Sequence, residues 1–214
     1  MNRFLLFPAL LLLCATGLAA TDGVYHSAPS YYLGVAPRIL KSLADLPAPL
    51  AQQVEQHLLA RLGAQFYHEL HFAGGQAADF TEDRWQSKDS DGDCAYELNF
   101  ELQRPAAGVI SYLALLSLKR DGSILREIDL PAVARAPARA GIITLAKARE
   151  IARARGFEGQ EITTEINYDP DRDILVWSFR KYADSGLQGL RYRVLEIAAH
   201  DITAIREYDS YAIP

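Results

Sequence analysis

Two histidines three positions apart, His68 and His71, have a spacing close to that of a metal-binding motif in this 214-residue chain. A helical zinc motif places its histidines four residues apart, so that both lie on one face of the helix. The surrounding segment 64–72 alternates apolar and polar residues and predicts a β-strand, in which an odd spacing sends side chains to opposite faces. We therefore expect two ordinary strand histidines and no zinc site.

Two acidic turns carry alternating carboxylates, a pattern that can converge on calcium. They are Asp89-Ser90-Asp91-Gly92-Asp93 and Asp169-Pro170-Asp171-Arg172-Asp173. An EF-hand loop needs glycine at its sixth position and glutamate at its twelfth. The first turn has Cys94 and Phe100 there, and the second has Ile174 and Arg180. The sequence therefore predicts solvated hairpin turns without a metal.

Nucleophilic catalysis has one candidate, Cys94, because the chain lacks a Gly-x-Ser-x-Gly elbow and a glycine-rich phosphate loop. A reactive thiolate needs electropositive surroundings, whereas Asp91 and Asp93 come directly before this cysteine. We predict that Cys94 is a partly buried strand residue, and we expect no catalytic residue and no cofactor. A small exported enzyme, with Cys94 or His68 in a pocket, stays open as an alternative.

The segment 73–93 is long for a hairpin connection and contains two aromatic residues and several acids. Long loops on a rigid scaffold are frequently functional, and tryptophan is enriched at binding hot spots. We therefore predict that Phe80, Trp85, Asp89 and Asp91 contact a partner. In the alternative interpretation, both aromatic side chains fold back on the sheet.

A first helix is predicted from apolar residues that recur every four positions, from Leu50 to Leu62, with Gly63 as its end. Four segments then predict antiparallel strands: the first two alternate apolar and polar residues, the third is mostly apolar, and the fourth follows Asp121-Gly122, which is typical of a hairpin turn. These segments are 64–72, 94–102, 109–118 and 123–130. A shorter helix is expected around residues 38–45.

A second helix is predicted after an alanine- and proline-rich linker at 131–142. Thr144 is a suitable N-cap and Gly156 a suitable end. Four more strand-like segments follow, at 161–168, 174–182, 190–198 and 203–208. We therefore predict an α+β fold of two tandem units, 21–130 and 143–214, each with one helix and a four-stranded antiparallel sheet.

The two units also share residues at matching positions. Arg126-Glu127-Ile128-Asp129 aligns with Arg206-Glu207-Tyr208-Asp209, 80 positions later, whereas Leu50-Ala51 aligns with Leu145-Ala146 at an offset of 95. An insertion in the first hairpin, within 73–93, accounts for the difference between the offsets. Agreement in both residues and element order favours an internal duplication.

The second unit resembles a PepSY-type domain in its helix start and in several strand residues. The matching positions are Thr144, Ala148, Ala152, Gly156, Ile166-Asn167-Tyr168-Asp169, Trp177 and Tyr192-Arg193-Val194. The family's final turn usually ends in glycine, whereas His200-Asp201-Ile202-Thr203-Ala204 lacks it. The resemblance covers about a third of the chain and implies an exported, non-catalytic module of cystatin-like shape that binds or inhibits proteins, often peptidases. The tandem arrangement is similar, at the level of fold, to the beta-lactamase inhibitor proteins.

Export is predicted from residues 1–20, where an apolar run, Phe4–Leu13, precedes small residues suited to signal peptidase. Lipoprotein anchoring at Cys14 is disfavoured, because Leu13 stands where a small residue is expected. No later segment is apolar enough to cross a membrane. A net charge of -5 argues against a nucleic-acid partner. The expected location is the periplasm or outside the cell.

These observations together predict an exported, non-enzymatic protein-binding module that inhibits a peptidase or another envelope enzyme. A periplasmic immunity protein that blocks a toxin is an alternative within the same class. The expected partner is another protein, and the sequence leaves its identity and the oligomeric state of this chain open.

Overall fold

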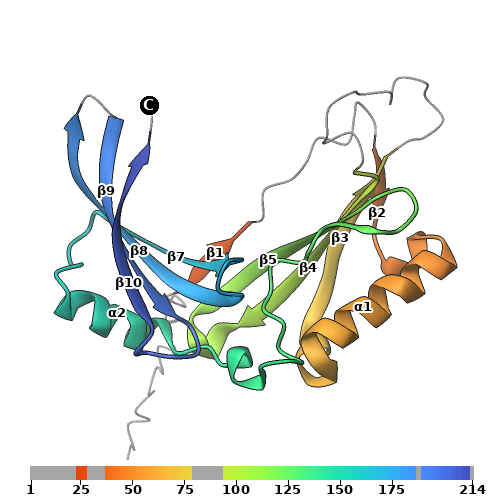
Figure 1. Cartoon of the computed structure of the whole chain (residues 1–214), viewed down its shortest axis with the longest axis horizontal. Helices are drawn as coiled ribbons and strands as arrows, with labels where there is room; N and C mark the ends of the chain where they lie inside the picture. Colours follow the sequence, from red (N-terminus) through yellow and green to blue (C-terminus); the bar gives the residue numbers. More distant parts are fainter. Residues whose placement is uncertain (1–22, 28–36, 79–93, 187–188, 213–214) are drawn as a thin grey trace, which may run out of the picture.

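The computed structural model has an α+β fold with two sheets and two α-helices in the residues that it describes, which are 23–27, 37–78, 94–186 and 189–212 (Figure 1). One sheet is mixed, with the order β1-β5-β4-β3-β2 and with β6 paired to β5. The other sheet is antiparallel, with the order β10-β9-β8-β7. The predicted signal peptide, Cys14 and the partner-binding residues Phe80, Trp85, Asp89 and Asp91 lie outside the described residues.

The strands and helices have the following bounds. The mixed sheet contains β1 (Val24–His26), β2 (Arg38–Leu40), β3 (Leu70–Ala77), β4 (Tyr96–Arg104), β5 (Val109–Leu118) and β6 (Ile124–Arg126). The antiparallel sheet contains β7 (Ile162–Asp169), β8 (Ile174–Gly186), β9 (Gly189–Ala198) and β10 (Ile205–Ala212). The helices are α1 (Ala48–Tyr67) and α2 (Leu145–Ala154), with short 3-10 turns η1 (Leu43–Asp45), η4 (Pro105–Ala107) and η5 (Pro137–Ala140). Neither α-helix is long and apolar enough to cross a membrane, within the described residues.

Helix α1 continues past Gly63, where the sequence predicts its end. Gly63 leaves the helical region (φ 75, ψ 156) and kinks the helix, which then resumes for one more turn to Tyr67. Phe66 is 3% exposed and extends the four-residue apolar spacing beyond Leu62. The predicted strand over 64–72 is therefore wrong up to residue 69, because burial of Phe66 in the core outweighs the local alternation. Strand β3 begins at Leu70 and continues to Ala77, so the first residues of the segment 73–93, predicted as a loop, belong to a strand.

The first sheet differs from the prediction of four antiparallel strands, because β1 and β2 add to it and β1 pairs with β5 in parallel. Both added strands are three residues long, which is too short to show a period of two in the sequence. Strand β2 and the turn η1 also replace the helix expected around 38–45. Strand β1 lies against β7 as well as β5, so it occupies the junction between the two sheets.

The predicted N-cap of helix α2 is confirmed, since the Thr144 hydroxyl oxygen accepts a hydrogen bond from the Lys147 backbone N–H at 3.2 Å. Leu145 packs against Gly108, in the turn between β4 and β5 of the first sheet, and the preceding Ile143 carbonyl accepts a hydrogen bond from the Trp177 indole of β8 at 3.0 Å. The helix thus contacts both sheets, and the four-stranded sheet has no helix to itself among the described residues.

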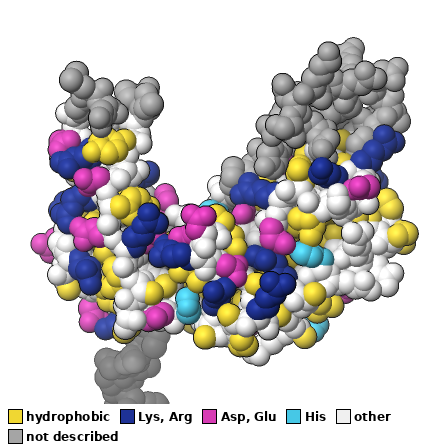
Figure 2. Space-filling model, viewed as in Figure 1, with side chains coloured by type: hydrophobic (Ala, Val, Ile, Leu, Met, Phe, Trp, Pro, Cys, Tyr) yellow, Lys and Arg dark blue, Asp and Glu magenta, His cyan; other side chains and the backbone are white. Residues whose placement is uncertain are grey.

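A hydrophobic core runs through both sheets on the side of the helices. Leu98, Phe100 and Leu102 of β4 enter this core together with Trp177 and Phe179 of β8. Both helices lie on this side of the sheets (Figure 1). Since strand side chains alternate between faces, the residues between these positions point to the opposite face. Figure 2 shows the molecule hollowed between its two arms on the side away from the helices.

Candidate functional site

The two histidines of the metal-like motif are placed on different elements. His68 is the C-cap of α1, so the prediction of a strand histidine is wrong for this residue, whereas His71 lies on β3 opposite Glu101. The structure does not place either histidine in a group of three or more His, Cys, Asp or Glu side chains that could hold a metal ion, within the described part of the chain.

Two carboxylates of the second acidic turn, those of Asp169 and Asp173, form ion pairs with arginines. Asp169 accepts a hydrogen bond from Arg172 Nε at 2.5 Å, and Asp173 accepts one from Arg139 Nη1 at 2.5 Å. Asp173 also accepts from Arg61 Nη2 at 3.2 Å and from the Tyr168 hydroxyl at 2.8 Å. The carboxylates of Asp169 and Asp173 are thus engaged in ion pairs, and this turn connects β7 and β8 to α1 and to the predicted linker.

Cys94 is 4% exposed. Burial raises the pKa of its thiol to about 11, with Glu97 contributing in the same direction. The thiol therefore stays protonated near neutral pH, whereas a nucleophilic cysteine acts as the thiolate. The sequence predicts a partly buried strand residue, whereas the structure buries Cys94 almost completely and begins β4 two residues later, at Tyr96.

A cluster of tyrosines and arginines lies on the face of the four-stranded sheet away from the helices. We call it the tyrosine–arginine patch; its residues are Arg180 and Tyr182 of β8, Tyr192 of β9, and Arg206 and Tyr208 of β10. The strand register explains the cluster, because Tyr182 is opposite Tyr192, and Val194 is opposite both Arg180 and Tyr208. Cross-strand neighbours on one face lie close enough for long side chains to touch.

The side chains of the patch stack in two sets, one on β8 and β9 and the other on β10. The rings of Tyr182 and Tyr192 meet edge to face with centroids 5.9 Å apart. The Arg180 guanidinium lies 5.1 Å from the centre of the Tyr192 ring, and that of Arg206 lies 4.7 Å from the centre of the Tyr208 ring. These cation–π contacts hold the arginines over the aromatic rings while Arg180 and Arg206 stay exposed.

Glu196 and Arg172 form an ion pair beside the patch, and Glu196 also binds Tyr208 of the patch. The Tyr208 hydroxyl donates to Glu196 Oε1 at 2.8 Å, and Arg172 Nη2 donates to Glu196 Oε2 at 2.5 Å. Burial and the hydrogen bond to Glu196 together raise the pKa of Tyr208 to about 12, so it remains a neutral hydroxyl. The ring of Tyr208 is thereby held in a defined position.

The first sheet contributes one further exposed aromatic residue at the junction. Tyr25 of β1 is 72% exposed and is opposite Ser111 of β5. The Ser111 hydroxyl donates to Glu101 Oε1 at 2.5 Å, which places this pair on the face of β4 and β5 away from the core. Because Tyr25 is paired with Ser111, its side chain lies on the same face of the sheet.

Sequence reasoning did not identify the patch, because its members come from three strands and meet only through register. The available signal is the recurrence of Tyr and Arg at alternate positions, in Arg180-x-Tyr182 and Arg206-x-Tyr208. The matching motif of the first unit makes different contacts: Arg126 pairs with Asp129, whereas Arg206 stacks on Tyr208. The Arg-Glu-x-Asp motif that the two units share therefore does not form the same site in both.

No protein-family model matches this chain, and neither a curated protein nor a solved structure matches it.

Proposed function

We propose that this chain is an exported, non-enzymatic protein-binding module that binds a partner protein through the tyrosine–arginine patch. Binding would inhibit a peptidase or another envelope enzyme by covering its cleft. The expected location is the periplasm or outside the cell, following the predicted signal peptide at residues 1–20.

The observation that carries this proposal is the composition of the patch. Tyrosine and arginine are enriched at binding hot spots, because each combines a large contact area with hydrogen-bonding groups. The stacking of Arg180 and Arg206 on Tyr192 and Tyr208 reduces the freedom that these side chains would lose on binding. No helix covers this face among the described residues, so a partner can reach it.

Two further features belong to the proposal. The resemblance of the second unit to PepSY-type domains supports a role in protein binding, although the structure gives the first sheet six strands and leaves the four-stranded sheet without a helix of its own among the described residues. The segment 73–93, with Phe80, Trp85, Asp89 and Asp91, is a second proposed contact with the partner.

The test uses the exported protein as bait in a periplasmic extract, followed by identification and purification of the captured partner. The affinity of that purified partner is then measured for the wild type and for the double variant Tyr192→Ala/Arg206→Ala. We expect the double variant to bind at least about tenfold more weakly, as hot-spot truncation costs more than 1 kcal/mol. Addition of the wild type to a captured enzyme should lower its turnover.

A matched control is Glu55→Ala, an exposed residue on α1 away from the patch. A Phe80→Ala/Trp85→Ala variant tests the segment 73–93 separately. The patch proposal is overturned if the Tyr192/Arg206 variant is folded and binds as tightly as the Glu55 control. Inhibition is overturned if the partner binds and its activity is unchanged.

A further inference from the structure

The strands of the four-stranded sheet contain four arginines, and only two of them form ion pairs within the part of the chain that the structure describes. The pairs are Arg191 with Asp184 and Asp209, and Arg193 with Glu207. The other two arginines are Arg180 and Arg206 of the tyrosine–arginine patch, whose guanidinium groups contact the rings of Tyr192 and Tyr208 instead. The unpaired arginines of this sheet therefore both belong to the patch.

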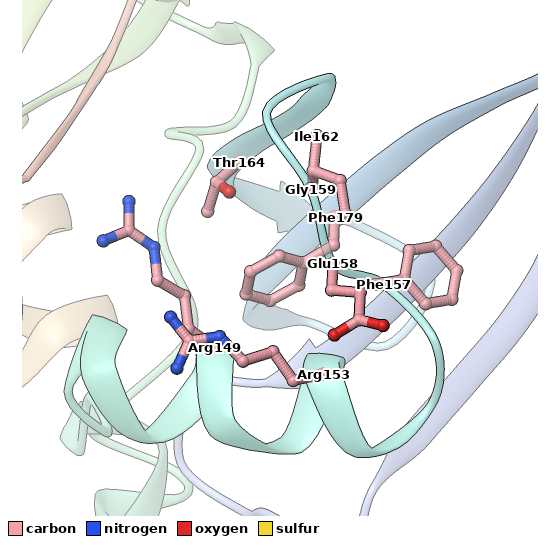
Figure 3. Close-up of a pocket in the computed structure, with 8 residues that line it drawn as sticks. All are labelled: Arg149, Arg153, Phe157, Glu158, Gly159, Ile162, Thr164 and Phe179. Atoms are coloured by element: carbon pink, nitrogen blue, oxygen red, sulfur yellow. The ribbon is translucent and has the colours of Figure 1, made fainter.

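The paired and the unpaired arginines lie on opposite faces of the sheet. Figure 3 shows Phe179 of β8 beside the hollow next to α2, on the face that the helices cover. Successive strand residues alternate in direction, so Arg180 points to the opposite face. The Arg193 guanidinium lies 5.2 Å from the centre of the Phe157 ring, just after α2, and is therefore on the helix side. The face away from the helices thus carries the arginines that lack a carboxylate.

Both unpaired arginines have hydrogen-bond donors to offer. Arg180 and Arg206 are exposed, and neither donates a hydrogen bond to another residue in the described ranges. A guanidinium group has five N–H donors in a planar fork that fits a carboxylate, and its contact with an aromatic ring uses none of them. The hydroxyls of Tyr182 and Tyr192 likewise have no hydrogen-bond partner in those ranges. The patch therefore presents donors that a ligand rich in acceptors would satisfy.

Two acids lie on the same face and limit where an anion can bind. Glu196 is opposite Arg206 by register, but its carboxylate oxygens accept hydrogen bonds from Tyr208 and Arg172. Glu165 of β7 lies in the same cross-strand row as Glu196. Arg206 stacks on Tyr208, two positions further along β10, and thus away from this row. An anion therefore has its most favourable position on the side of the patch away from the two acids.

We propose that the patch binds an acidic segment of the partner protein, in which separate carboxylates pair with Arg180 and with Arg206. This inference rests on the proposed function of the patch and adds the chemistry of its partner. The two arginines lie on β8 and β10, with β9 between them, so their backbones are about 10 Å apart across the sheet and each serves its own carboxylate.

The charge of the whole chain makes the patch decisive for such a partner. With a net charge of -5, the rest of the surface repels an acidic segment, so the attraction must come from the patch itself. Two unpaired arginines suit a pair of carboxylates, each of which is satisfied by one guanidinium fork. They are few for a nucleic acid, whose binding typically neutralises several phosphates.

The first experiment titrates the full exported protein into a fluorescently labelled decaglutamate peptide at pH 7 and low salt, and follows the anisotropy. Decaglutamine and an oligothymidylate of ten nucleotides are the comparison probes. We expect saturable binding of decaglutamate that Arg180→Gln/Arg206→Gln weakens at least about tenfold, since each lost pair is a charged hydrogen bond. Arg180→Lys/Arg206→Lys should weaken it less, because it keeps both charges, and added NaCl should weaken it by screening.

Arg191→Gln/Arg193→Gln is the matched control, since it removes the same two charges from the opposite face of the same sheet. The circular dichroism spectrum of each variant checks that it is folded. The inference is overturned by no binding of decaglutamate, by equal binding of decaglutamine or oligothymidylate, or by an equal loss of affinity in the control.

The second experiment measures the affinity of the captured partner for the same variants. A loss with Tyr192→Ala/Arg206→Ala but none with Arg180→Gln/Arg206→Gln would keep the patch as the binding site and overturn its acidic ligand. No loss with either variant would overturn both the proposed function of the patch and this inference. A loss of at least about tenfold with both, and none with the control, supports an acidic partner segment on the patch.

Discussion

At the scale of single residues, burial decides what the chemically capable side chains can do. Cys94 is the one free cysteine in the described residues, and its thiol is buried beside the acidic Glu97. Tyr208 has the reactive group of a phenol but is held as a neutral donor to Glu196. In both cases the surroundings favour the protonated form, which suits packing and recognition better than nucleophilic chemistry.

Alkylation of Cys94 should be slow in the native protein. With a pKa of about 11 the thiolate fraction at pH 8 is about a hundredth of that of an unfolded thiol, so the rate with iodoacetamide should fall at least about 100-fold. The reaction is measured in buffer and in urea, with Cys14→Ser to leave a single thiol. Because the native state holds this proton more tightly than the unfolded state, stability should also decrease as the pH rises above about 9. Equal rates in buffer and urea would contradict the buried position.

At the scale of elements, the kink in α1 shows where local pattern and packing disagree. Gly63 adopts φ 75 and ψ 156, a combination that is almost restricted to glycine. The Ala134 backbone N–H donates to the Arg61 carbonyl at 3.0 Å next to the kink, so the predicted linker supplies a partner for the helix backbone. The kink lets Phe66 reach the core and then directs the chain into β3.

Substitution of Gly63 by alanine should destabilise the protein by about 1–3 kcal/mol, the range for a non-glycine residue in this backbone region. The added Cβ would approach Ala134 no closer than 3.8 Å, so the cost comes from the backbone and not from a clash. The free energy of unfolding in urea measures it. Gln65→Ala, an exposed change in the same turn, should alter stability by less than about 0.5 kcal/mol. A Gly63→Ala protein as stable as this control would argue against the kink.

Most of the strands could be predicted from the alternation or the apolar character of their segments. The segments predicted at 94–102, 109–118, 174–182 and 190–198 agree with β4, β5, β8 and β9 to within a few residues. Strands β1 and β2 could not be predicted, because three residues show no period. The tyrosine–arginine patch could not be predicted either, since Tyr182, Tyr192 and Tyr208 become neighbours only when the register of three strands is known.

At the scale of the whole molecule, strand β1 and the side chain of Asp173 join the two sheets, in addition to helix α2 and the shared core. Strand β1 pairs with β5 and lies against β7. Asp173, in the turn between β7 and β8, accepts hydrogen bonds from Arg61 of α1, from Arg139 of η5 and from the Ala132 backbone N–H. One carboxylate thus ties the second sheet to the first helix and to the segment 131–142, so this segment is packed against both.

Asp173→Asn should lower the free energy of unfolding by about 1.5–3 kcal/mol, because it weakens several charged hydrogen bonds at a side chain that is 27% exposed. Amide hydrogen exchange should show β7 and β8 opening more readily than β4 and β5 in this variant. Asp171→Asn, an exposed change in the same turn, is the control and should have little effect. Equal stability of the two variants would show that Asp173 does not connect the sheets.

The sequence by itself determined the two helices, most of the strands and the acidic, half-apolar composition, because periodicity records which side of each element is buried. Only the tertiary structure decided that β1 pairs in parallel, that α2 contacts both sheets, that Asp173 bridges distant segments and that the tyrosines and arginines form one patch. These features depend on contacts between residues far apart in the chain. The period of a single element encodes its exposure to solvent and not the identity or register of its neighbours.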